Sequence, residues 1–255
     1  MSDLGFQPAG EAASSLSQWQ RVACTFTAPS KTFEDIQRGN KSWWMPFIIL
    51  AIVGYILFAA VAFKIGMQTV VDNQIKFDPK TAERMAQAPP DQREMGTKIS
   101  LYITEGIFIA NPAFLLGGVA LLSLGLWGTI NFVFGGKATY GSIFSVWMFA
   151  SLPSIIKTLL GTVVIFAGED PETFNIKNFA PTNLAALLYP NAAEANKALY
   201  SLASSLDFVT IWTLVLLSIG VATVAGVKRS SGYIAVFGWW MIFVLIGVGW
   251  AAAMS

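Results

Sequence analysis

The sequence contains no histidine, only one cysteine and few charged residues. Without histidine the chain can build no His-based metal site, no His general base and no catalytic triad that needs one. Cys24 has no partner for an internal disulfide, so folding does not rely on oxidation. Charged residues make up 12% of the chain, against roughly 25% in an average soluble domain. The net charge of +1 gives no electrostatic basis for binding nucleic acid.

The sequence is rich in long apolar segments. Hydrophobic residues make up 55% of the chain, and a helix of about 20 such residues crosses a hydrocarbon core roughly 30 Å thick. Five segments have this character: residues 44–63, 111–134, 143–167, 207–227 and 233–253. We therefore predict an all-α fold, a polytopic integral membrane helical bundle with about five transmembrane helices in residues 43–255.

Residues 1–42 precede the first predicted span and carry an amphipathic pattern. Apolar side chains recur at helical spacing on either side of an Ala28-Pro29 break, at Leu16, Trp19, Ala23, Phe26, Phe33 and Ile36. The pattern predicts two short amphipathic helices in a cytoplasmic segment. Their apolar faces lie either on the inner membrane surface or against the protein itself, and the sequence favours neither arrangement.

The connections between the spans indicate the orientation of the chain. Residues 65–110 include an apolar stretch at Ile99–Ala110, which we expect at the membrane interface, and residues 168–206 include helix-like pieces at Asn183–Leu188 and Ala192–Leu206. The inner and outer segments hold seven Lys and Arg residues each, but the inner segments are shorter and have a net positive charge. This bias predicts a cytoplasmic N-terminus and a C-terminus outside.

Lys157 stands out within the third predicted span. A charged side chain near the middle of a bilayer costs about 2.5–3.5 kcal/mol on insertion scales. Lys157 follows Pro153, which removes a helix hydrogen bond and frees a carbonyl. Lys157 is either a counter-charge for an anionic ligand or lipid headgroup, or a snorkelling side chain that pairs with a freed carbonyl or with an acid such as Asp207.

Ser154 and Lys157 also form an S-x-x-K spacing, which is one arrangement of a Ser nucleophile and a Lys base. The motif is so short that it often arises by chance, and a Ser beside a helix-breaking Pro has a structural role as a cap. No HExxH, GxSxG, P-loop or CxxC motif accompanies it. We therefore expect a protein that is not an enzyme and that holds no cofactor or metal.

Small and amide side chains predict close helix packing. Small residues fall at every fourth position on the last two spans, at Ser218, Ala222 and Gly226 and at Gly247 and Ala251. Stripes of this kind let helices approach closely in lipid, and amides inside a membrane often bridge helices. We expect the latter role for Asn111 and Asn131.

Several segments together suggest a family. They are the amphipathic Trp19–Phe26, the following Ala28–Ile36, Trp44-Met45-Pro46, Asp207-Phe208 through Ile211-Trp212, Lys228-Arg229-Ser230-Ser231 and Trp239-Trp240, together with the Pro153 of the third span. This series resembles bacterial members of the Yip domain family, named after Ypt-interacting proteins, over about residues 16–254. The resemblance implies a five-span fold in the bacterial inner membrane. Eukaryotic relatives bind prenylated small GTPases, a role that does not transfer with the fold.

Two hypotheses about function follow. The first is a non-enzymatic scaffold or accessory subunit in membrane organisation or export, whose partners are lipids, further copies of itself or export machinery. The second is a transporter of small molecules or lipids, or a lipid-handling protein, with a path near Lys157 and Pro153. The family resemblance and the small-residue stripes favour the first, and the costly charge of Lys157 favours the second.

Overall fold

The computed structural model describes residues 15–189 and 195–253, which form helices and loops and no strand. Five helical segments in this part of the chain are long and apolar enough to cross a membrane. They are α3 with the π-helical turn η1 (Trp44–Ala60 and Val61–Ile65), α7 with η2 (Asn111–Gly128 and Thr129–Val133), α8 with α9 (Tyr140–Ala150 and Ser154–Phe166), α12 (Phe208–Ala225) and α13 (Arg229–Ala253). The predicted fold class, an all-α polytopic membrane bundle, is confirmed.

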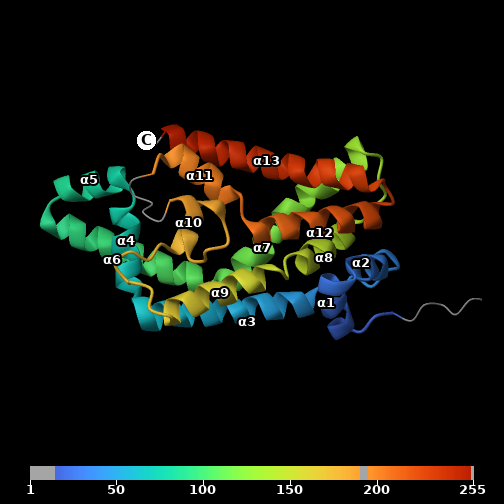
Figure 1. The fold of residues 1–255 in the computed structure, drawn as a ribbon, viewed down its shortest axis with the longest axis horizontal. Coiled ribbons are helices and arrows are strands. Elements are labelled where there is room, and N and C mark those ends of the chain that lie inside the picture. The colour runs from blue at the N-terminus through green and yellow to red at the C-terminus, as the bar shows by residue number, and fades with distance from the viewer. Residues whose placement is uncertain (1–14, 190–194, 254–255) are drawn as a thin grey trace, which may run out of the picture.

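Shorter helices lie at both ends of the bundle (Figure 1). They are α1 (Gln18–Thr27), α2 (Pro29–Gln37), α4 (Met67–Lys76), α5 (Pro79–Gln87), α6 (Pro90–Ile109), the 3-10 turn η3 (Ile176–Asn178), α10 (Leu184–Leu188) and α11 (Lys197–Ser205). Helices α1 and α2 form a hairpin at one end, which we call the hairpin end; α4, α5, α10 and α11 lie toward the opposite end. Of the stretch predicted as helical at Ala192–Leu206, residues 192–194 lie outside the described residues.

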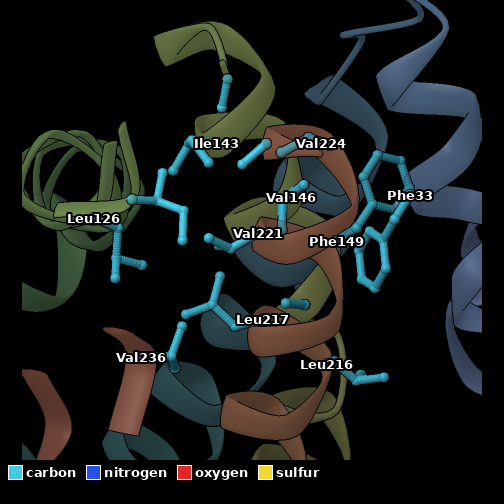
Figure 2. Close-up of a cluster of buried hydrophobic side chains, with 14 of the residues drawn as sticks. Phe33, Leu126, Ile143, Val146, Phe149, Leu216, Leu217, Val221, Val224 and Val236 are labelled. Atoms are coloured by element: carbon cyan, nitrogen blue, oxygen red, sulfur yellow. The ribbon is translucent and has the colours of Figure 1, made fainter. Parts of the chain in front are cut away.

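Helix α12 is the centre of the bundle. Half of its residues are buried inside the protein, a larger share than in any other candidate span. Figure 2 shows the cluster around it, where Val221 and Leu217 of α12 meet Val146 of α8 and Val236 of α13. Phe33 of α2 belongs to the same cluster and is fully buried. The hairpin is therefore part of the core.

Pro153 divides the third span. Helix α8 ends at Ala150, a turn follows, and α9 begins at Ser154. A proline cannot continue a helix without loss of a backbone hydrogen bond, and the turn satisfies the freed groups locally. The backbone amide and the hydroxyl of Ser154 both donate to the carbonyl of Ser151, at 3.0 and 2.7 Å. The span thus bends at mid-length without leaving polar groups in lipid.

The small residues of α12 divide into two roles. Ser218 and Ala222 are buried, and a side chain at Gly232 on α13 would meet the Ser218 carbonyl and the Ala222 methyl group. The three residues mark the close crossing of α12 and α13. Gly226 is different. It ends α12 in the left-handed conformation at φ 67°, so its prediction as a packing residue is wrong, because it is a helix C-cap.

Gly247 and Ala251 on α13 do not face another span. The nearest group to a side chain at Gly247 would be the Ser201 hydroxyl of α11, at 3.8 Å. Ala251 lines a cavity whose wall includes Ser201, Ser204 and Ser205 of α11. The stripe therefore makes room for the short helix α11 beside α13 rather than for a neighbouring transmembrane helix (Figure 1).

Candidate functional site

Lys157 forms an ion pair with Asp207. Its ammonium lies 3.0 Å from Asp207 Oδ2 and 5.8 Å from the centre of the Phe179 ring. The Lys157 side chain is 25% exposed, whereas that of Asp207 is 2% exposed. The sequence offered a freed carbonyl or an acid such as Asp207 as the partner of a snorkelling Lys157. The structure shows Asp207 as that partner.

Asp207 holds three segments together. Its Oδ1 accepts from the Thr210 backbone amide at 2.8 Å and caps α12, and its Oδ2 accepts from the Thr182 hydroxyl at 2.5 Å as well as from Lys157. Burial opposes ionisation of Asp207, but the hydrogen bonds from Thr182, Thr210 and Lys157 outweigh it and hold the pKa of this carboxyl below its ordinary value. The cluster therefore fastens the loop at Thr182 and helix α9 to the start of α12.

Ser154 takes no part in this cluster. Its hydroxyl donates to Ser151 in the turn after α8, while Lys157 bonds to Asp207. No hydrogen bond joins Ser154 to Lys157 in the described part of the chain. A Ser nucleophile needs a base within hydrogen-bond reach, so the geometry gives Ser154 a structural task.

The two asparagines have different neighbours. Asn111 is the first residue of α7, and its amide would lie 2.6 Å from a Cβ at Gly54, so it packs tightly against α3. Asn131 pairs through both amide atoms with the backbone of Ala138, at 2.9 Å each. It closes the loop between η2 and α8 and does not bridge two spans, because the loop backbone supplies both partners that an amide needs.

The hairpin encloses a charged group. Arg21 is fully buried, and its guanidinium donates to the carbonyls of Ser42 and Asn40, at 2.8 Å each. Arg21 Nε lies 3.4 Å from Asp35 Oδ2, and the guanidinium carbon lies 4.3 Å from the centre of the Phe149 ring. Burial lowers the pKa of Arg21 to about 10, although Asp35 acts in the opposite direction. Arg21 therefore remains charged at neutral pH.

Asp35 completes this buried cluster. Its side chain is 1% exposed and accepts from the Asn40 amide at 2.9 Å and from the Leu16 backbone amide at 3.2 Å. Arg38 lies 3.5 Å away at the surface. Buried charges survive in a fold when they are paired and hydrogen-bonded. The Arg21–Asp35 pair thus joins α1, α2 and the segment that enters α3.

The opposite face of α1 is apolar and exposed. Trp19 is 67% exposed and Phe26 is 36% exposed, and Ala23 between them is also exposed. An amphipathic helix in water turns its apolar face to the protein, and α1 does the reverse. The Phe26 ring meets Trp212 of α12 edge-on at 5.9 Å, so the apolar face continues onto the span.

At its end of the bundle, the hairpin packs against the side of α12. A side chain at Gly220 of α12 would meet Phe33 at 3.0 Å, and the Gln37 amide donates to the Thr223 carbonyl at 2.7 Å. Both contacts lie within α12, which ends at Ala225. The exposed face of α1 is therefore level with apolar surface of the spans.

The sequence did not predict this arrangement, because it favoured neither the membrane surface nor the protein as the environment of the apolar face. One signal was present. Arg21 and Thr25, one turn apart, lie on the face opposite Trp19, and Asp35 on the next helix carries the matching charge. Sequence spacing alone did not show that this polar face points inward.

Comparison with known proteins agrees with the fold. The profile of the Yip1 domain matches residues 23–251. The chain belongs to the Yip1 domain family. The membrane protein YknW of Bacillus subtilis (strain 168) is 25% identical over 225 residues, which cover 86% of this chain and 86% of that protein. No solved structure matches. The protein is thus a multi-pass Yip1 domain membrane protein, and the match includes all of α2 and most of α13.

Proposed function

We propose that the protein is a non-enzymatic scaffold or accessory subunit of the bacterial inner membrane, and that it acts through its α1–α2 hairpin. The observation that carries this proposal is the inverted placement of α1, with Arg21 buried in the protein and Trp19 and Phe26 outward. A face of this composition lies in the interface between headgroups and acyl chains. A hairpin seated there offers a surface to lipids and to neighbouring membrane proteins.

Charge at the hairpin end supports a cytoplasmic position for the hairpin. Apart from the paired Arg21 and Asp35, one acid lies among the described residues of this end, Glu34. The basic residues of the hairpin and of the loops next to it are Lys31, Arg38, Lys41, Lys137, Lys228 and Arg229. An excess of Lys and Arg marks cytoplasmic segments, and anionic lipids of the cytoplasmic leaflet attract them. Helix α13 ends at Ala253 toward the opposite end (Figure 1), so the proposal puts this end of the helix outside.

The scaffold proposal predicts a partner that crosslinks to the protein in its native membrane. Mass spectrometry of the crosslinked, tagged protein is expected to recover one membrane protein in stoichiometric amount. Because Trp19 and Phe26 form the exposed face, the double variant Trp19→Ser/Phe26→Ser should lower that recovery about tenfold, the loss expected for roughly 1.4 kcal/mol of apolar contact.

A matched control uses the same helix. Thr27 is exposed on α1 without contributing large apolar surface, so Thr27→Ser should leave the recovered partner unchanged. Recovery of the wild-type protein alone, or only with copies of itself and lipid, would contradict the accessory-subunit role.

The second candidate function, lipid handling or transport, has one observation in its favour. A cavity of about 420 Å³ lies between the spans, and Ser154 and Asn111 line it. It falls within the 300–1,000 Å³ that is usual for ligand sites. Lys157 is not among its lining residues, so this candidate draws on the cavity and not on the charge of Lys157.

A further inference from the structure

The cavity between the spans is largely apolar. Leu57 of α3, Phe108 of α6, Leu115 of α7 and Ile155 of α9 contribute to its wall. Its polar groups are few and uncharged, among them Thr158. A slot of this lining suits an acyl chain, which needs apolar contact and no charge.

A second cavity, of about 550 Å³, has the opposite character. It lies toward the opposite end of the molecule, where Ala251 near the end of α13 lines it together with segments that follow or precede the spans. Among the described residues three lysines line it, Lys76, Lys177 and Lys197. Asp78 contributes a carboxylate to the lining, and the positive charge of Lys197 attracts this carboxylate. Ser204 adds a buried hydroxyl that has no hydrogen-bond partner among the described residues. Among the described lining residues, three ammonium groups against one carboxylate favour an anion.

The two cavities share part of their walls. Gln74 of α4 lines both. The segment through η3 also serves both cavities, because Ile176 and Phe179 line the apolar cavity and Lys177 and Asn178 line the basic one. An apolar cavity within the membrane domain therefore lies beside a basic cavity toward the end of the bundle. This order matches one chemical class, an amphiphile with an acyl chain and an anionic head.

We propose that the paired cavities bind an anionic phospholipid from the leaflet at the opposite end, with an acyl chain in the apolar cavity and the phosphate beside Lys76 and Lys177. Basic pockets beside membrane helices recognise anionic headgroups in this way. The site is independent of the scaffold role, because it lies at the opposite end from the hairpin.

The test is native mass spectrometry of the purified full-length protein in micelles that contain equal amounts of phosphatidylglycerol and phosphatidylcholine with identical chains. The wild-type protein is expected to retain phosphatidylglycerol at least about fivefold better, since a lysine near an anionic surface contributes about 1 kcal/mol. Lys76→Gln/Lys177→Gln should remove this preference. Lys98→Gln is the control, because Lys98 is paired with Glu94 on the exposed surface of α6.

The apolar cavity is tested with two neighbouring residues. Leu115→Trp fills the cavity and should reduce retention of both lipids about tenfold, whereas Phe114→Trp, at a position exposed toward lipid, should retain both. All variants are compared as monodisperse samples. Unchanged phosphatidylglycerol preference in the double lysine variant, or unchanged retention in Leu115→Trp, would overturn the proposal. Displacement of the lipid by inorganic phosphate would also overturn it, by showing that the basic cavity binds a free anion.

Discussion

Replacing Asp35 with alanine is expected to lower the free energy of opening the hairpin by about 3–5 kcal/mol, the usual cost of removing one partner from a buried ion pair. Asp35 accepts from Leu16 and Asn40 and neutralises Arg21, which is fully buried. Without it the guanidinium keeps its charge and loses its counter-charge. The backbone amides of α1 report this opening, because those that are bonded within the helix exchange with solvent when it opens.

The measurement is the rate of amide hydrogen exchange in α1 of the micelle-solubilised protein. Under conditions where closing is fast, the rate should rise about 100- to 4,000-fold in Asp35→Ala. Arg38→Gln removes an exposed partner of Asp35 and should change the opening free energy by about 0–1 kcal/mol. The double variant Arg21→Met/Asp35→Leu should recover part of the loss. Equal rates in Asp35→Ala and the wild-type protein would show that the pair does not hold the hairpin.

Replacing Asp207 with alanine is expected to cost about 3 kcal/mol of unfolding free energy, because the change removes the cap of α12 and the counter-charge of Lys157. Asp207→Asn keeps a good capping side chain and should cost about 1–2 kcal/mol. Lys157→Met should cost about 1 kcal/mol, since Thr182 and Thr210 still bond to the carboxylate. Titration of the folded protein in mixed micelles with a denaturing detergent measures each change.

The same site predicts a pH dependence. The pKa of Asp207 lies below its ordinary value of 3.8 in the folded protein, so between the two values the unfolded chain binds more protons. The stabilisation is therefore complete above the ordinary value and is lost as the pH falls through the folded value. Asp207→Asn should lack this component of acid destabilisation. An identical acid profile in the variant and the wild-type protein would contradict the assignment.

The fold was predictable because lipid imposes a strong constraint on sequence. Long uncharged runs can satisfy their backbone in hydrocarbon only as helices, and the five candidate spans follow from them. Capping side chains determine where individual helices begin. The third span begins at Tyr140, because Thr139 caps it by accepting from the Ser142 amide. Gly226 shows the limit of spacing arguments, since the same small residue serves as a packing position or as a C-cap.

The candidate sites were predictable only where local pattern determines them. Lys157 stood out because a charge inside a bilayer is costly, and Asp207 was among its possible partners. Thr182, which donates to the same carboxylate, lies in a loop. The path of a loop has no periodic sequence pattern, so this contact was not predictable. The inward face of α1 depends on Asp35, Asn40 and Phe149, which other segments bring to Arg21. The paired cavities likewise arise from segments that meet only in the folded protein.

The proposed position of the exposed α1 face in the membrane is tested by the environment of a nitroxide at position 19. The label is placed by Trp19→Cys in a Cys24→Ser background of the full-length protein in liposomes, with Lys31→Cys on the exposed surface of α2 as the control. We predict more collisions with oxygen than with a water-soluble nickel complex at position 19, and the reverse at position 31. Nickel accessibility at position 19 equal to that at position 31 would place α1 in water and contradict the account.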